Sequence, residues 1–390
     1  MTARPLKIAV VAGEVSGDLL GGDLIAALRR QYDGPVELVG VGGEALTGEG
    51  LVSLFDYSEL SIMGFTQVIA RLPRMISLIR KTADAIIAAR PDVLLIIDSP
   101  DFTHRVAKRV RKALPDLPVV KYVCPSVWAW KEYRARAMLS YVDHVLAVLP
   151  FEPEVMKRLG GPPTTFIGHR LASDPSLLRA RTARAARGAV PVGSTRTIML
   201  LPGSRGFEIG KLLPLMGEAV MELVARNGDL RFVLPTVARR EALVREIVAN
   251  WPVRPEVVVG DEGKWRAFAE ADAAVAASGT VVLELALAGV PSISVYKTDW
   301  IVKMLASRIK IWTAALPNLI ADYPVVPEYI DHTLRPGSVT RWMERLSVES
   351  LQRKAMLEGF ERVQQRLTPE VPAGEAGAGI VLDLLKSRGF

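Results

Sequence analysis

The sequence contains very little cysteine. Cys124 is the one cysteine among 390 residues, so no disulfide can form within the chain, and a reducing compartment is expected. A small buried apolar side chain is the simplest interpretation of Cys124. The four histidines show none of the spacings typical of metal ligands. These scarcities predict a protein that is held together by neither disulfides nor a structural metal.

Long uninterrupted apolar runs are also missing. Glu284 interrupts the longest candidate, residues 273–298, and neither half reaches the ~18 residues that a membrane span needs. Residues 1–7 are too short and polar for a signal peptide. The charge is mildly basic, with 49 Lys and Arg against 42 Asp and Glu, a net +7. This excess suits acidic ligands or an anionic membrane surface, and no nucleic-acid-binding motif accompanies it.

Apolar strand patterns and helical patterns alternate through most of the chain. Hydrophobic residues make up 49% and charged residues 23%, which is typical of a globular protein. Repeated strand–helix alternation predicts parallel sheets with right-handed crossovers. We therefore expect a Rossmann-like domain at residues 1–172, a helix and linker rich in Ala and Arg at 173–196, and a second Rossmann-like domain at 197–350. Residues 351–390 are expected to form helices that pack on the first domain or on a second subunit.

The strand-to-helix turn SGTVVLE, residues 278–284, is the first candidate for a ligand site. A helix start leaves backbone N–H groups unpaired and partly positive, which suits an anionic phosphate. Gly279 lets the backbone approach a ligand, and Ser278 and Thr280 add hydroxyl donors. Glu284 lies one turn beyond Thr280, where its carboxylate could accept both hydroxyls of a ribose. An ordinary capped turn with a solvated Glu explains the spacing equally well.

A second Gly/Ser loop follows the first predicted strand of the same half. It contains Gly203, Ser204 and Arg205 and precedes a helical pattern. A guanidinium is a fork-shaped donor that matches a diphosphate. Two such loops in one half of the chain favour a nucleotide site there.

In the first half an acid ends a buried strand. Asp98 follows the apolar run at residues 92–97, and open α/β sheets bind ligands at the carboxyl ends of their strands. Asp101 could cap the following helix, which would leave Asp98 free for chemistry. Trp128 and Trp130 lie in a later loop, where a tryptophan either stacks on a sugar ring or packs into the core.

Residues 60–70, LSIMGFTQVIA, carry no charge, and Arg71 and Arg74 follow them. Such a segment is either buried or an exposed patch that rests on a membrane beside its cations. The residues alone favour burial.

Seven blocks together resemble the lipid-A-disaccharide synthase family. They are AGEVSGD (12–18), SIMGF (61–65), DSPDF (98–102), PSVWAWK (125–131), LLPGSR (200–205), SGTVVLE (278–284) and LPNLI (316–320). The blocks run in the family's order and are jointly specific, whereas residues 173–196 and those after 368 show no resemblance. The resemblance implies a GT-B fold, in which two Rossmann-like parallel-sheet domains face a cleft. It places the donor nucleotide on the C-terminal half and the acceptor on the N-terminal half.

The resemblance also implies an inverting glycosyl transfer without a cofactor. A 2,3-diacylglucosamine moves from UDP to the 6-hydroxyl of 2,3-diacylglucosamine 1-phosphate, which gives a β-1,6-linked disaccharide 1-phosphate and UDP. Such a step needs a base and charge stabilisation for the departing UDP. Asp98 is the expected base and Glu14 the next candidate, and the acceptor side is expected to include Ser16, Trp128 and Asn318. The sequence has no Asp-x-Asp pair to hold a metal, so protein cations are expected to stabilise the diphosphate.

The acylated substrates that the resemblance implies lie in a bilayer, so membrane contact becomes the preferred interpretation of residues 60–70. We expect Met63, Phe65, Ile69 and Leu72 to touch the membrane, with the protein peripheral on the cytoplasmic side of the inner membrane. A second copy of the chain is a candidate partner, and nucleic acid is not. Two alternatives stay open: an isomerase similar to UDP-sugar 2-epimerases, which needs no lipid contact, and a membrane-docked nucleotide-binding module, which has no use for an acid at Asp98.

Overall fold

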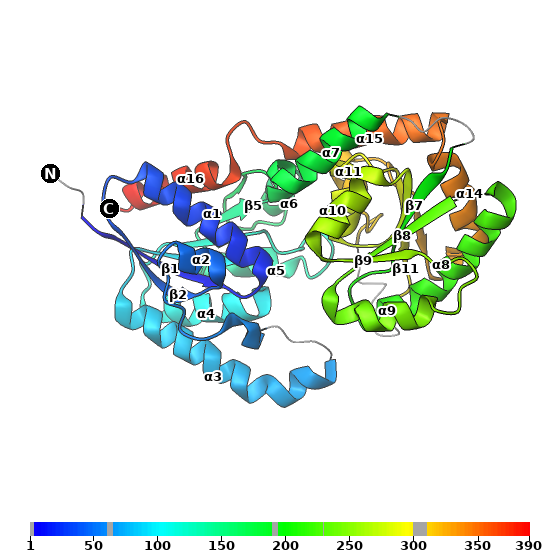
Figure 1. Ribbon diagram of the computed structural model, residues 1–390. Coiled ribbons are helices and arrows are strands. Elements are labelled where there is room, and N and C mark those ends of the chain that lie inside the picture. Colours follow the sequence, from blue (N-terminus) through cyan, green and yellow to red (C-terminus); the bar gives the residue numbers. More distant parts are fainter. Residues whose placement is uncertain (1–3, 61–64, 189–193, 229, 299–309) are drawn as a thin grey trace. The chain divides into compact units, whose positions relative to one another are not determined.

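The computed structural model describes residues 4–390 apart from 61–64, 189–193, 229 and 299–309, and the side chains of residues 65–71 also lie outside the description. The chain forms two compact units, one of Met1–Arg170 with Pro369–Phe390 and one of Leu171–Thr368. Each unit is an α/β fold with its own sheet (Figure 1). This division differs from the ranges expected from the sequence, because residues 175–187 and 351–367 form helices within the second unit.

The first unit contains a six-stranded parallel sheet in the order β2-β1-β3-β4-β5-β6. The strands are β1 (Leu6–Ala12), β2 (Val36–Val41), β3 (Val93–Ile97), β4 (Val119–Tyr122), β5 (His144–Ala147) and β6 (Thr164–Phe166). Helices cover both faces of such a sheet, so its central strands are apolar throughout rather than alternating. All five residues of β3, VLLII, are buried for this reason.

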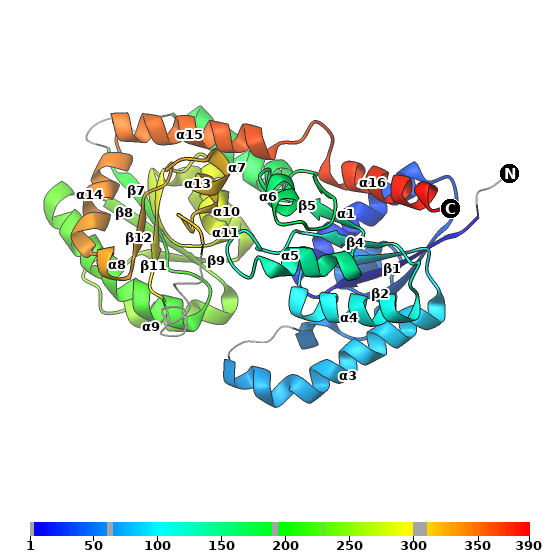
Figure 2. The ribbon, with the colours of Figure 1, turned by 180° about the vertical axis from the view of Figure 1, so that it is seen from behind.

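Two layers of helices enclose this sheet. One apolar core joins the sheet to α3 and α4, and the other joins it to α1, α2 and α16. Figure 2 shows α3 and α4 on one side of this sheet and α1 and α16 on the other. The helices are α1 (Val15–Gln31), α2 (Glu44–Gly48), α3 (Phe65–Ala89), α4 (Pro100–Ala113), α5 (Tyr133–Ala137), α6 (Glu152–Arg158) and α16 (Ala373–Ser387), with short 3-10 helices η1 (Tyr57–Leu60) and η2 (Met138–Ser140). The last helix of the chain, α16, returns to this unit and packs along α1 (Figures 1 and 2).

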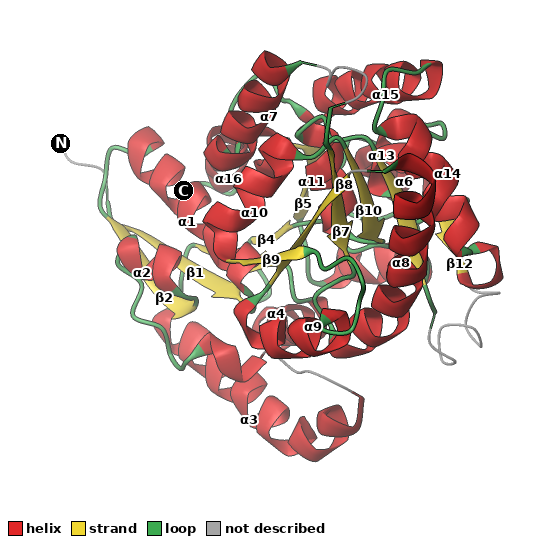
Figure 3. Cartoon of the chain, turned by 45° about the vertical axis from the view of Figure 1, so that its right-hand side comes forward, coloured by secondary structure: helices red, strands yellow, loops and turns green. Residues whose placement is uncertain are grey.

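The second unit repeats the plan with the parallel strand order β12-β11-β10-β7-β8-β9. The strands are β7 (Arg196–Leu201), β8 (Leu230–Thr236), β9 (Glu256–Val259), β10 (Ala273–Ala277), β11 (Ser292–Tyr296) and β12 (Glu328–Ile330). Helices α8 and α14 pack on one side, and α7, α10, α11 and α15 on the other, so red helices flank the yellow strands in Figure 3.

The helices of this unit connect its strands or follow them. They are α7 (Pro175–Arg187), α8 (Gly206–Asn227), α9 (Glu241–Val248), α10 (Gly260–Glu270), α11 (Thr280–Leu287), α13 (Leu316–Ala321), α14 (Pro336–Leu346) and α15 (Leu351–Leu367), with 3-10 helices η3 (Arg170–Ser173), which leads in from the first unit, η4 (Ala238–Arg240) and η6 (Asp331–Thr333). Within the described residues, no helix is both long and apolar enough to cross a membrane.

Arginines fix α7, which lies in the segment expected to be a linker, to the second unit. The buried Arg184 donates to the carbonyl oxygens of Ala271 and Gly289, and Arg187 pairs with Asp272 at 2.7 Å. A mobile linker would leave these guanidiniums in water. Their engagement with buried carbonyl groups and with the Asp272 carboxylate explains why the helix of this segment belongs to the second unit.

Candidate functional site

A cavity of about 550 Å³ opens where β7, β8 and β10 end in the second unit. Every residue that the sequence predicted to bind a nucleotide lines it: Gly203, Ser204, Arg205, Ser278, Gly279, Thr280 and Glu284. The two predicted loops meet because β7 and β10 are neighbouring parallel strands, which end at the same edge of the sheet.

The start of α11 faces this cavity. Gly279 precedes the helix with φ +152°, and a Cβ built on it would meet nothing within 4 Å. The space beside Gly279 is therefore open to a ligand, and the backbone there takes a conformation that side chains disfavour. A helix start in this position presents N–H groups to an anion.

The loop after β7 is held by Glu208. Gly203 has φ +101°, and a Cβ on it would lie 2.4 Å from a Glu208 carboxylate oxygen. The same carboxylate accepts from the Arg205 backbone N–H at 3.3 Å and from the Arg205 side chain at 3.0 Å. The Arg205 side chain is still 67% exposed, so most of its guanidinium donors face solvent beside the cavity.

Lys264 on α10 is a cavity residue that the sequence analysis missed. Its ammonium pairs with the Glu284 carboxylate at 2.8 Å, and both side chains are mostly buried. It also lies over the Trp265 ring, 4.5 Å from the centroid. The hydroxyl of Thr236, at the end of β8, lines the same cavity without a hydrogen-bond partner in the described structure. Only the packing of α10 against the sheet could have pointed to Lys264.

In the first unit, Asp98 directly follows β3 and lies at the carboxyl edge of its sheet. Asp98 and Ser99 have φ +46° and +39°, a left-handed conformation that is unusual outside glycine. The Asp98 N–H donates to Tyr122, and its carbonyl accepts from Thr103 at 2.8 Å and Lys121 at 2.6 Å. Among the described residues the Asp98 carboxylate makes no hydrogen bond or ion pair.

The expected cap for the next helix is wrong. Helix α4 begins at Pro100, and its N-cap is Ser99, with no side-chain cap bond. Asp101 instead lies exposed within the first turn, because the left-handed turn at residues 98–99 starts the helix earlier than a capping acid would.

The turn that leads from β1 into α1 lies beside Asp98, since β1 and β3 are neighbours. A Cβ on Gly13 would come within 2.6 Å of the Ser99 hydroxyl oxygen, and one on Gly17 would lie 3.6 Å from the Asp98 Cβ. Glu14 is the N-cap of α1 without a side-chain cap bond, and Glu14 and Ser16 are both exposed. The two acids considered as base thus come from adjacent strand ends.

Trp128 is engaged inside the first unit. Its ring packs edge-on against Phe151 at 5.4 Å, and its indole N–H donates to Glu152 at 3.2 Å. Glu152 is buried and also accepts from the backbone of Val148 and Leu149. Burial raises the pKa of Glu152 to about 7, although these hydrogen bonds oppose the shift. The contacts favour packing over sugar stacking for Trp128.

Asn318 is fully engaged as well. It lies in α13 and is 2% exposed. Its amide donates to Thr313 and to the Val326 carbonyl, and its oxygen accepts from two backbone N–H groups. With every donor and acceptor satisfied, Asn318 organises its own segment and has no group left for an acceptor sugar.

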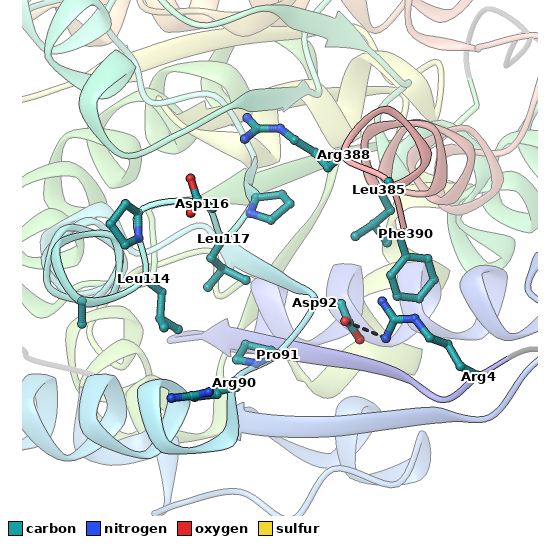
Figure 4. A pocket seen from close by; sticks show the side chains of 14 residues that line it. Arg4, Arg90, Pro91, Asp92, Leu114, Asp116, Leu117, Leu385, Arg388 and Phe390 are labelled. Carbon is teal, nitrogen blue, oxygen red and sulfur yellow. Dashed lines mark hydrogen bonds and ion pairs between the residues drawn. The ribbon is translucent and has the colours of Figure 1, made fainter.

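A second hollow lies at the opposite, amino-terminal edge of the first sheet (Figure 4). Arg4 pairs there with Asp92 at 2.9 Å and stacks on Phe390. None of the residues predicted to act in function lines it. Open parallel sheets bind ligands at their carboxyl edges, so the cavity of the second unit is the stronger candidate.

The two helix-covered parallel sheets give the chain the GT-B fold. A solved structure of the glycosyltransferase of kitacinnamycin matches with a TM-score of 0.60 at 16% identity, over 98% of this chain and 100% of that one. A putative UDP-N-acetylglucosamine 2-epimerase from Listeria monocytogenes matches with a TM-score of 0.59 at 16% identity, over 98% and 96%. These likenesses confirm the expected fold.

The sequence comparison is more specific. The family described as lipid-A-disaccharide synthetase matches residues 8–370. A lipid-A-disaccharide synthase from Nitrobacter winogradskyi is 46% identical over 97% of this chain and 96% of its own length. The chain belongs to the lipid-A-disaccharide synthetase family, as its seven sequence blocks predicted.

Proposed function

We propose that the protein transfers 2,3-diacylglucosamine from UDP to the 6-hydroxyl of 2,3-diacylglucosamine 1-phosphate, with inversion at the transferred carbon. The observation that carries this proposal is the cavity of the second unit, where all seven residues predicted for the nucleotide meet. Family membership supports the same reaction. The second unit is then the donor domain, and the first unit takes the acceptor and the membrane.

The hydrogen-bonding groups that line the cavity indicate how it would bind the UDP-sugar. The start of α11 and the exposed guanidinium of Arg205 suit the diphosphate, because both supply N–H groups to developing negative charge. The Glu284 carboxylate, held by Lys264, suits the ribose hydroxyls. The unpartnered Thr236 hydroxyl offers a further contact to the nucleoside.

For the acceptor, Asp98 is the proposed base. A sugar hydroxyl is a weak nucleophile at neutral pH, so a carboxylate must lie within hydrogen-bond reach of it. Asp98 has a fixed backbone and a carboxylate without a partner among the described residues, which suits this role. Glu14, at the adjacent strand end, is the second candidate.

We further propose that α3 contacts the inner membrane from the cytoplasmic side. Leu72 and Ile76 are 45% and 39% exposed on this helix. Met63 lies outside the described residues, as do the side chains of Phe65 and Ile69. Exposed apolar side chains near basic residues suit a surface that meets lipid, where the acyl chains of both substrates reside. A homodimer also stays a prediction.

The test is direct turnover. Purified protein is incubated with both substrates, and products are identified by mass spectrometry. Formation of the tetraacylated disaccharide 1-phosphate with release of UDP is the expected result. Conversion of the UDP-sugar to an epimer without acceptor consumption, or UDP binding without any product, would contradict the proposal.

A further inference from the structure

The turn at Asp98 and Ser99 is a strained backbone segment held from several sides. Two successive residues with side chains adopt left-handed φ values there, which persists only where the surroundings enforce it. Because φ of Asp98 sets the direction of its Cα–Cβ bond, this strain decides where the carboxylate points.

The main-chain oxygen of Asp98 is the anchor of the turn. The Thr103 hydroxyl donates to it at 2.8 Å, and the Lys121 ammonium donates to it at 2.6 Å. Thr103 also donates to the Ser99 carbonyl, and the Asp98 N–H is fixed on Tyr122. Both polar groups of the Asp98 backbone are therefore occupied.

Lys121 is a costly residue in this position. It lies in the middle of the parallel sheet and is 1% exposed, next to Val120 and Tyr122, which are buried in the apolar core. Its hydrogen bond to the Asp98 carbonyl is the one that its ammonium forms among the described residues. Burial lowers the pKa of Lys121 to about 8, and the Asp98 charge opposes that shift. An apolar side chain would fill the space without this penalty, so the ammonium has a use other than packing.

We infer that Lys121 is a positioning residue for Asp98, whose ammonium locks the left-handed turn and thereby aims the carboxylate. This inference rests on the proposed role of Asp98 as the base. Lys121 itself is too deeply buried to touch a substrate, and its ammonium donates to the main-chain carbonyl of Asp98. Its removal should leave the acid in place but turned away from the acceptor hydroxyl.

The test compares Lys121→Met, which has a similar length and no charge, with Lys112→Met on the exposed side of α4 as a control. Lys121→Met should lower kcat by about 10²-fold, the effect of a small misplacement of a reacting group. The KM of both substrates and the affinity for UDP should stay within about threefold, because binding groups are untouched. Lys112→Met should match the wild type.

A double-mutant cycle separates positioning from general damage. Added to Asp98→Asn, Lys121→Met should lower turnover little further, since the group that it positions is already disabled. An equal loss of kcat with and without Asp98→Asn, or a wild-type kcat for Lys121→Met, would overturn the inference. If Lys121→Met does not fold, Thr103→Val removes the other donor to the same oxygen and is judged by the same cycle. Full turnover by Asp98→Asn would instead overturn the proposed base, and the inference with it.

Discussion

At the scale of single residues, the Asp98 carboxylate is the acid on which the proposed chemistry depends. Asn keeps its size but cannot take a proton, so Asp98→Asn should cut kcat by ~10²–10⁴-fold, the usual contribution of a general base. UDP affinity should not change, because the residues proposed for the nucleotide lie in the other unit. Turnover assays and UDP titration measure both.

Asp101→Asn is the control for Asp98. The residue lies in the first turn of α4 rather than at its cap, so the change should cost only ~0.3–1 kcal/mol of helix-dipole stabilisation. Loss of turnover in this variant with full activity in Asp98→Asn would show that the wrong acid was chosen. If neither change matters, Glu14 becomes the next base to test.

Arg205 and Glu284 carry the donor prediction. Arg205→Ala should weaken UDP binding by ~1.5–3 kcal/mol, the range for a hydrogen bond to a charged group. Glu284→Gln should cause a smaller loss, from the ribose contact and from the released Lys264. Arg245→Ala is the control, since its partner is Glu241 one turn away on α9. Calorimetric titration of UDP that finds both affinities unchanged would refute a nucleotide site in this cavity.

Glu152 makes stability depend on pH. Its pKa is raised from 4.5 to about 7 by burial, so the native state keeps a proton that the unfolded state has lost between those values. The resulting contribution to the free energy of unfolding is fully present below pH 4.5 and is lost as the pH rises through about 7. From the difference between the two pKa values it is on the order of 3 kcal/mol.

Glu152→Gln removes this titration. The stability difference between wild type and variant, from urea unfolding at pH 4.5 and 7.5, should therefore shift against the wild type at the higher pH. The contributions of all other titrating groups are the same in both proteins and drop out of this comparison. The unfavourable contact of the Gln amide with the Trp128 N–H does not depend on pH, so it does not affect the shift. A difference that does not vary with pH would contradict a protonated Glu152.

At the scale of elements, α3 is the helix proposed to touch lipid. Joint replacement of Leu72 and Ile76 by Ser should weaken binding to anionic liposomes by tenfold or more, since each buried aliphatic side chain contributes ~1.5–3 kcal/mol. Thermal stability should change little, because both side chains are already exposed. Liposome flotation and thermal melting are the measurements.

Leu351→Ser is the matched control for α3. Leu351 is 81% exposed on α15, in the other unit, and its loss should leave flotation unchanged. Unaltered liposome binding by the α3 variant would exclude this helix from the membrane surface. A large loss of stability would show that its side chains are core.

At the scale of the whole molecule, charge is expected to replace a metal. The net charge is +7, and the described residues contain no group of three His, Cys, Asp or Glu side chains that could hold an ion. Arg205 and the start of α11 can take the diphosphate charge instead. Activity should persist in excess EDTA, and its abolition with rescue by magnesium would refute this.

The sequence by itself determined most of the helices and strands and the two loops that line the cavity of the second unit. Apolar runs such as VLLII at β3 and the Gly and Pro that interrupt them are local signals, so the alternation of strand and helix could be predicted. Parallel strands of one sheet end at one edge, which is why Arg205 and Glu284 could be expected together. The short edge strand β12 and the helix α13 lacked such periods and were missed.

Only the tertiary structure decided which side chains meet across elements. Lys264 reaches Glu284 because α10 and α11 both pack on the sheet of the second unit. Lys121 reaches Asp98 because β3 and β4 are neighbouring strands in register. Tertiary packing also gave Trp128 and Asn318 hydrogen-bond partners inside their own units, Glu152 and the Val326 carbonyl. It fixed α7 to the second unit through Arg184. These contacts join residues that are far apart in sequence, so no local sequence pattern predicts them. They form because buried polar groups must be hydrogen-bonded, and the available partners depend on how the sheets and helices pack.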